Sequence, residues 1–174
     1  ALAAVAAFNT ILAAAAAALG WMTFEWFDRR RPTLLGLLSG VVGGLVAVTP
    51  AAGFVDPKGA FFIGLIAGPA CYAGAVWLKH ALKYDDSLDA FGVHGIGGVV
   101  GALLTGLFAT TSVNALAEGA AVWKQAVGLA GAIAWSAVGT FVVLMICKFT
   151  TGLRVSKDQE VEGLDYTQHG EAIH

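Results

Sequence analysis

Charged residues are scarce in this sequence. Asp, Glu, Lys and Arg make up 13% of the chain, whereas 57% of it is hydrophobic and the mean hydropathy is +0.75. Soluble domains carry about 25% charged residues. A soluble domain of this size needs more polar cover than these residues provide. The composition therefore indicates a membrane protein.

The sequence also lacks the patterns on which enzymes and nucleic-acid-binding proteins depend. Its two cysteines, Cys71 and Cys147, have neither a metal-binding nor a redox spacing. No nucleophile and base pair, phosphate-binding loop or cluster of metal ligands is present. The basic residues are scattered at the ends of apolar segments and form no patch interleaved with aromatic residues. We therefore expect no enzymatic activity, no metal or cofactor and no binding to nucleic acid.

The charges fall in clusters and leave long uncharged intervals between them. Each interval can supply the roughly 20 apolar residues that an α-helix needs to cross a bilayer. The five intervals are Ala1–Phe24, Pro32–Val55, Gly59–Leu78, Ala90–Ala117 and Gln125–Cys147. They predict an all-α, polytopic membrane bundle of five transmembrane helices. We expect a transmembrane domain over residues 1–149 and a cytoplasmic tail over residues 150–174, where the hydrophobic pattern stops.

The basic residues predict how these helices are oriented. With a cytoplasmic C-terminus, eight of the ten Lys and Arg residues face the cytoplasm and only Lys58 and Lys124 face outward. An odd number of spans then puts the N-terminus of the chain outside a cell (inner) membrane. No signal pattern precedes the first apolar residues. We therefore expect the chain to be the downstream part of a longer protein.

His94 is the strongest candidate for function. It lies within the 28 uncharged residues from Ala90 to Ala117, where an imidazole loses its water unless protein or a wet cavity replaces it. At about 1.5 Å per residue, His94 and Ser39 lie roughly 7–12 Å from the starts of their helices, so they can share one layer. A neutral imidazole offers one donor and one acceptor to a small polar molecule. The alternatives are a packing histidine bonded to a carbonyl, and a serine bonded to its own preceding turn.

The segment before His94 contains candidates for a helix cap. Asp86, Ser87 and Asp89 are each able to accept hydrogen bonds from the amides at the start of the fourth span. Capping explains the aspartates better than a role in binding does. We expect Asp89 to be the cap near the candidate pore.

Several segments carry a resemblance to a known family, and it extends over nearly the whole chain in the right order. They are Asn9-Thr10, Ser39-Gly40, Gly44-Leu45-Val46, Val48-Thr49-Pro50-Ala51, Asp89-Ala90-Phe91-Gly92-Val93-His94-Gly95, Gly152-Leu153-Arg154-Val155 and the tail motif from Glu162 to Glu171. Together they resemble the C-terminal half of an ammonium transporter of the Amt/Mep/Rh family.

The resemblance implies more than the residues do by themselves. The family fold has eleven transmembrane helices, built from two inverted five-helix repeats, and assembles as a homotrimer with a hydrophobic, histidine-lined pore in each subunit. This chain is similar to the last five helices. The resemblance makes His94 the second of two pore histidines and places Ser39 near the lower pore. It also implies that ammonium or ammonia is transported and that the tail contacts a PII-type signalling protein.

Some family features have no counterpart here. The partner histidine, the phenylalanine gate and the outer recruiting site belong to the other half, so we expect this chain alone not to conduct. Two other functions stay open. A transporter-like ammonium sensor would use the same bundle but is expected to carry a signalling domain longer than Thr150–His174, and a structural membrane subunit would need no polar group at position 94.

Overall fold

In the computed structural model, which describes residues 1–171, the chain is all-α apart from a single isolated bridge between Val55 and Ala109. The elements are α1 (Leu2–Arg29), α2 (Leu34–Val48), α3 (Pro57–Tyr72), the π-helix η1 (Ala73–Leu78), α4 (Lys79–Leu82), the π-helix η2 (Phe91–Gly95), α5 (Ile96–Phe108), the 3-10 turn η3 (Ala115–Ala117), α6 (Val122–Thr150), α7 (Lys157–Glu162) and the π-helix η4 (Asp165–His169).

The predicted helices are present in the predicted order. Four helical segments are long and apolar enough to cross a membrane: Leu2–Arg29, Pro57–Leu82, Phe91–Phe108 and Val122–Thr150. The second predicted span is a shorter apolar helix of 15 residues, α2. It begins after Thr33, whose hydroxyl accepts a hydrogen bond from the Gly36 amide, and it ends before Pro50, which has no amide proton to donate. The all-α polytopic architecture is confirmed.

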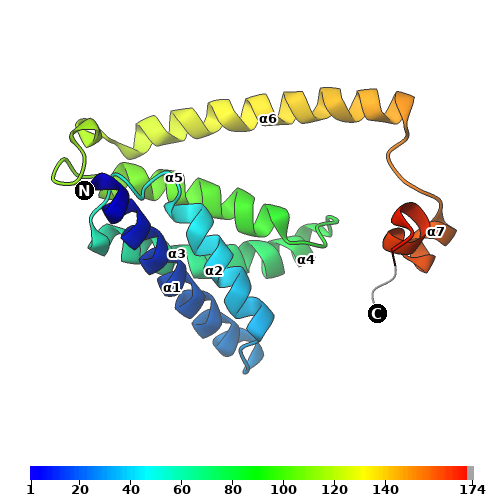
Figure 1. Cartoon of the computed structure of the whole chain (residues 1–174), viewed down its shortest axis with the longest axis horizontal. Helices are drawn as coiled ribbons and strands as arrows, with labels where there is room; N and C mark the ends of the chain where they lie inside the picture. The colour runs from blue at the N-terminus through cyan, green and yellow to red at the C-terminus, as the bar shows by residue number, and fades with distance from the viewer. Residues whose placement is uncertain (172–174) are drawn as a thin grey trace. The chain divides into compact units, whose positions relative to one another are not determined.

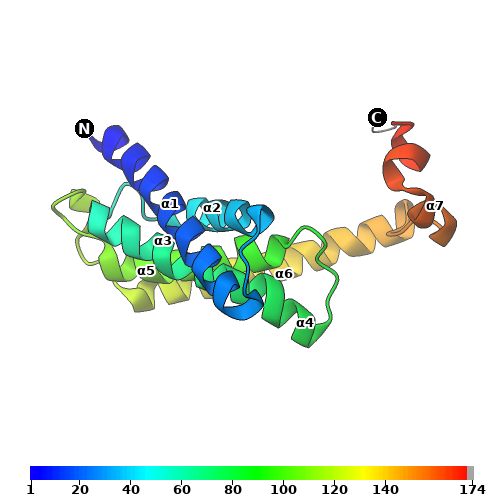
Figure 2. The same ribbon diagram turned by 90° about the horizontal axis from the view of Figure 1, so that it is seen from below.

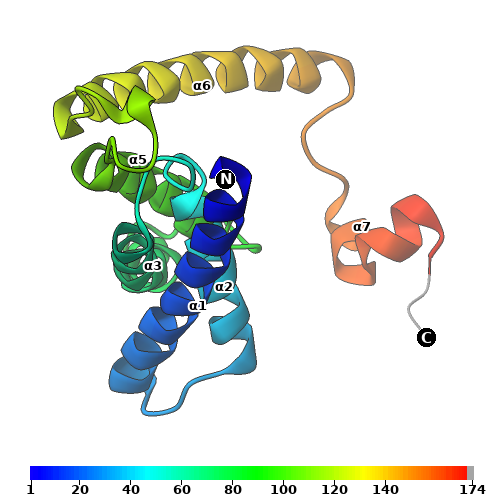
Figure 3. The same cartoon turned by 60° about the vertical axis from the view of Figure 1, so that its left-hand side comes forward.

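Two compact units divide the chain, Ala1–Ala130 and Gly131–His174. In the first unit α1 packs against both α2 and α3, and α5 packs against α2 and α3. Figure 1 shows α1 and α2 side by side, and Figure 3 shows the short connection that joins them. Figure 2 shows α4 continuing the line of α3. The expected domain boundary at residue 149 rests on hydrophobicity alone and stays a prediction.

Small residues bring the helices of the first unit together. The buried core includes Ala13, Ala17, Ala47 and Ala67, each fully buried. A Cβ added at Gly64 would lie only 2.1 Å from the carbonyl oxygen of Ala13. Backbones that approach this closely gain packing and interhelical contacts in a membrane, where hydrophobic burial between helices contributes little.

Asn9 holds the connection between α2 and α3 against α1. Its side chain is fully buried, and its amide nitrogen donates to the carbonyl oxygens of Ala52 at 2.9 Å and Val55 at 2.8 Å. These carbonyls belong to a turn, so they have no helical partner. A buried, unpaired carbonyl is costly, and Asn9 therefore stabilises the turn that precedes α3.

The second unit contains most of α6 and the short helix α7. Ser156 and Gln159 form a capping box at the start of α7. Arg154 pairs with Glu160, with a second contact from its Nη2 to Oε2 at 3.0 Å. The Arg154 guanidinium lowers the pKa of the Glu160 carboxyl. The pair is therefore formed above the ordinary pKa range of a glutamate and is lost as the pH falls through the lowered value.

Candidate functional site

His94 lies in a π-helical turn. The turn is η2, which continues into α5, and it packs against a second π-helical segment, η1, at the end of α3. The contact between them is close, because a Cβ added at Gly92 would lie 2.6 Å from Ala75 Cα. π-helical turns are rare and occur frequently at functional sites. No pattern of hydrophobic residues in the sequence indicates this turn.

The backbone around His94 is buried while its ring is not. Val93 is 5% exposed, and its carbonyl oxygen accepts a hydrogen bond from the Cys71 thiol at 3.6 Å. The His94 side chain is exposed, and within residues 1–171 no hydrogen bond to its ring is present. The turn therefore presents an unpaired imidazole from a fixed backbone. The role of this ring in a pore stays a prediction.

Ser39 lines a cavity of about 190 Å³ in the first unit. Asp89 lines the same cavity, and His94 does not. Across residues 1–171 the Ser39 hydroxyl makes no bond to its preceding turn, so it is available to a ligand. The full lining is Trp21, Glu25, Arg29, Thr33, Leu35, Gly36, Ser39, Tyr72, Ala75, Val76, Lys79, His80 and Asp89.

Two further polar groups of this cavity were not singled out by the sequence. Glu25 is 3% exposed, and its carboxylate accepts from both the amide and the hydroxyl of Thr33, at 3.1 and 3.0 Å. An anion is stabilised there by the N-terminus of α2. The Trp21 indole nitrogen is buried and has no partner among the described residues. Glu25 and Thr33 lie eight residues apart, a spacing that matches no known capping motif, so the sequence did not indicate this contact.

The prediction that Asp89 caps the fourth span is wrong, because Asp86 accepts the hydrogen bonds from the first amides of this span. The two Asp86 carboxylate oxygens accept from the amides of Ala90 at 2.8 Å and Phe91 at 2.9 Å. Asp89 has a left-handed backbone with φ of 53°, whereas a capping residue is usually extended. Its side chain instead binds Lys79 Nζ at 2.7 Å. The pair joins the first residue of α4 to the segment before η2 and is partly exposed, so it contributes little to stability.

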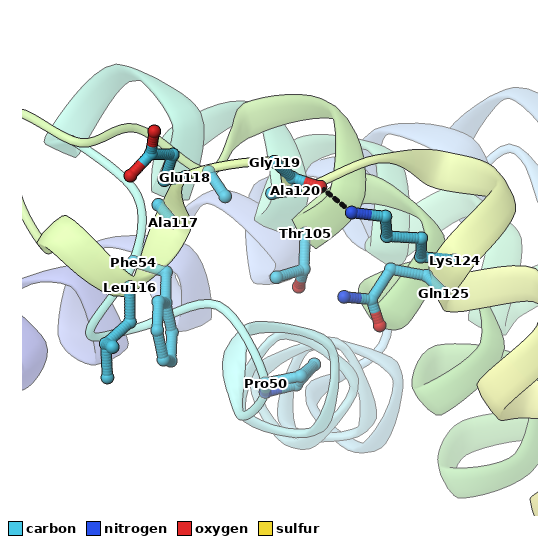
Figure 4. A pocket seen from close by; sticks show the side chains of 11 residues that line it. Pro50, Phe54, Thr105, Leu116, Ala117, Glu118, Gly119, Ala120, Lys124 and Gln125 are labelled. Atoms are coloured by element: carbon cyan, nitrogen blue, oxygen red, sulfur yellow. Dashed lines mark hydrogen bonds between the residues drawn. The ribbon is translucent and has the colours of Figure 1, made fainter.

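A second polar cavity, of about 290 Å³, lies at the other ends of α2 and α5 (Figure 4). Pro50 and Ala109, which follow those helices, line it together with Thr105 and Gln125. Lys124 also lines it, and its ammonium donates to the Gly119 carbonyl at 2.6 Å. Arg29 and Lys79 both line the first cavity.

Long apolar helices with polar cavities at both ends define a polytopic helical membrane protein. The family model described as Ammonium Transporter Family matches residues 1–173. This chain belongs to the ammonium transporter family, a family of transporters and not of enzymes, as the sequence predicted.

Curated relatives and solved structures agree with this assignment. The chain is 46% identical to an ammonium transporter of Bacillus subtilis over 170 residues, which are 94% of the chain and 42% of that relative. It matches the crystal structure of Saccharomyces cerevisiae Mep2 at 38% identity with a TM-score of 0.81, over 90% of this chain and 38% of that one. A structure titled Sensor Amt Protein matches at 32% identity with a TM-score of 0.86, over 96% and 42%. The chain thus spans less than half the length of these relatives.

Proposed function

We propose that this chain supplies the C-terminal part of a pore that passes ammonium or ammonia across the cell membrane. The observation that carries the proposal is the family match over residues 1–173. The relatives matched over most of this chain are named ammonium transporters. His94 and Ser39 line the conduit in this proposal, and of the four histidines in the sequence only His94 lies within an uncharged interval.

The chemistry of His94 suits this role. An unpaired imidazole on an apolar helix offers one donor and one acceptor to a small polar molecule that has shed its water. The exposed ring is covered, in this proposal, by the part of the protein that the chain does not contain. His94 then helps to replace the hydration of the permeating species and to pass a proton.

The remaining expectations belong to the same proposal. The N-terminus of the chain lies outside and its C-terminus in the cytoplasm, because eight of ten basic residues then face inward. The membrane domain covers residues 1–149, and residues 150–174 form a tail, of which residues 172–174 lie outside the described range. The subunits assemble as a homotrimer. The large exposed side chains of α6, Trp135 and Phe149 among them, are suited to lipid or to neighbouring helices.

Growth on limiting ammonium tests the proposal. We expect no rescue of cells lacking ammonium uptake by the 174-residue chain alone, because a pore formed between repeats leaves polar groups without partners when one half is missing. A chimera that joins the upstream part of the Bacillus subtilis relative to this chain is expected to restore growth. Rescue by the chain alone, or a membrane-inserted chimera that fails to rescue, would contradict the proposal.

The tail is proposed to regulate transport. Residues 156–171 are too polar to enter the bilayer, and α7 is held by its own capping box and the Arg154 pair. Deleting Ser156–His174 from the chimera should leave ammonium flux in place and abolish binding of a PII-type protein. Pull-down of the PII-type protein and vesicle flux, measured on the same preparations, check this. PII binding that persists at full strength after the deletion would show that the tail is not the docking segment.

Sensing is the second candidate function, because the structure titled Sensor Amt Protein matches the chain with a TM-score of 0.86. A sensor binds ammonium and changes the state of an attached domain without passing the ion at a useful rate. The flux measurement on the chimera separates the two. Saturable ammonium binding without flux would favour the sensor.

A further inference from the structure

A small pocket at the end of α1 combines aromatic walls with a carboxylate. Its volume is about 250 Å³, and it is lined by Phe24, Phe27, Asp28 and Trp77. Phe24 and Trp77 lie with ring centroids 5.5 Å apart and planes at 55°. Phe27 is 75% exposed and Trp77 is 47% exposed. The pocket therefore opens outward from the protein, between the ends of α1 and η1.

Two hydrogen-bond donors orient Asp28 in this pocket. The Tyr72 hydroxyl donates to Asp28 Oδ2, and the Trp77 indole nitrogen donates to the same oxygen at 3.4 Å. Tyr72 is only 1% exposed, and its ring meets those of Phe24 and Trp77 edge to face. Oδ1 accepts no hydrogen bond and joins no ion pair among the described residues. The Tyr72 and Trp77 donors thus orient the carboxylate through Oδ2 and leave Oδ1 available to a ligand.

The electrostatics of this position favour a cation. Asp28 lies in the last turn of α1, where the helix dipole disfavours an anion. Ring faces attract cations, and most strongly the face of a tryptophan. A carboxylate beside three aromatic side chains therefore gains from a positively charged partner. An ammonium group is able to donate to Oδ1 and contact the rings at once.

A second pocket carries the opposite charge. It is about 290 Å³ in volume, is lined by Thr23, Trp26, Phe27 and Arg30, and shares Phe27 with the first pocket. Arg30 begins the connection after α1, with Arg31 next to it. The exposed Phe27 side chain thus lines both the pocket that contains Asp28 and the pocket that contains Arg30. A ligand that extends across Phe27 meets a negative group in one pocket and a positive group in the other.

We propose that these two pockets bind one phospholipid headgroup of the phosphoethanolamine type. Its primary ammonium donates to Asp28 Oδ1 over the Phe24 and Trp77 rings, and its phosphate pairs with Arg30. The site lies where an apolar span of 28 residues meets its first charged cluster, which is the depth of lipid headgroups. A headgroup anchored by its chains reaches the pocket along the membrane surface. A free ammonium ion lacks both this anchor and the phosphate.

Lipid retention tests this site. The full chain is reconstituted in vesicles of equal parts phosphatidylethanolamine, its N-acetyl derivative and phosphatidylglycerol, then extracted in mild detergent, and its retained lipids are quantified. The N-acetyl derivative keeps the phosphate and the chains and loses only the ammonium charge. We expect phosphatidylethanolamine to be enriched over that derivative by about fivefold or more, as a charge-assisted hydrogen bond together with cation–π contacts implies.

Matched variants locate the effect. Asp28→Asn, which keeps the shape of the side chain, should bring the two lipids to near parity, and Trp77→Leu should reduce the enrichment in part. Asp85→Asn removes an exposed charge on the same side of the chain and should change nothing. Circular dichroism checks that each variant stays helical. Washing with ammonium chloride should displace no more phosphatidylethanolamine than sodium chloride does.

Three results would overturn the proposal. Equal retention of both lipids by the unaltered chain excludes recognition of the ammonium, whether or not any variant folds. Undiminished enrichment of phosphatidylethanolamine in a helical Asp28→Asn variant would show that Asp28 is not part of the binding site. Displacement specific to ammonium chloride assigns the pocket to the free cation and not to a lipid. None of these results depends on transport, so the site and the proposed function succeed or fail separately.

Discussion

Replacing Gly64 with alanine should destabilise the first unit by about 3 kcal/mol or more, beyond the usual cost of overpacking a core. The added Cβ would lie 2.1 Å from the carbonyl oxygen of Ala13 and 2.8 Å from its Cα and carbonyl carbon. These are backbone atoms of α1, so no side chain can rotate away. The helices α1 and α3 would have to separate where fully buried alanines now pack. Unfolding in a denaturing detergent, followed by helicity, measures the loss.

Gly98 provides the matched control. It also lies in an apolar helix, α5, but a Cβ added there would meet nothing within 4 Å. Gly98→Ala should leave stability unchanged or raise it by about 0.5–1 kcal/mol, because alanine restricts the unfolded chain. Similar loss in both variants would mean that glycine matters here for helix formation and not for the crossing of α1 and α3.

The sequence predicted the spans and the turn after α2, but not the long-range contact that holds this turn. The uncharged intervals correspond to the observed helices because burying a charge in hydrocarbon is costly, and this cost acts on composition alone. Hydrophobicity continues through Val55, but the prolines and the glycine in residues 49–57 predict a helix end and a turn there, and α2 does end at Val48. Backbone chemistry ends that helix, through a proline and a turn whose carbonyls are paired by Asn9. That pairing joins residues 43 and 46 positions apart, and no local pattern shows it.

The candidate site divides in the same way. The depth of His94 follows from the uncharged interval around it. Its π-helical turn depends on how closely Gly92 approaches Ala75, which is a property of the packed structure. Asp86 and Asp89 are chemically identical, and only the left-handed backbone of Asp89 decides which of them caps the helix. The sequence did not indicate the Asp28 pocket, because its aromatic side chains come from two separate helices and because aromatic residues are common at membrane interfaces.

His94→Ala in the chimera should reduce ammonium flux by about tenfold or more, since a hydrogen bond lost in an apolar conduit costs roughly 1.4 kcal/mol or more and each such amount is tenfold in rate. Removing both ring nitrogens leaves an apolar turn, because the other residues of η2 are Phe91, Gly92, Val93 and Gly95. Discrimination against potassium should fall as well, since selectivity in a pore depends on the groups that line it. Flux and potassium leakage in reconstituted vesicles measure both effects.

Two further variants serve as comparisons for His94→Ala. His94→Glu retains an ionisable group that is able to pass a proton, so its loss of flux should be smaller than that of His94→Ala. His169→Ala removes an imidazole from the short helix η4, beyond the last apolar span, and should leave flux unchanged. Trimers should assemble in all three, because the proposal places the ring in the conduit and not between subunits. Normal flux with normal discrimination against potassium in a trimeric His94→Ala protein would make His94 a packing residue and remove the basis of the proposed pore.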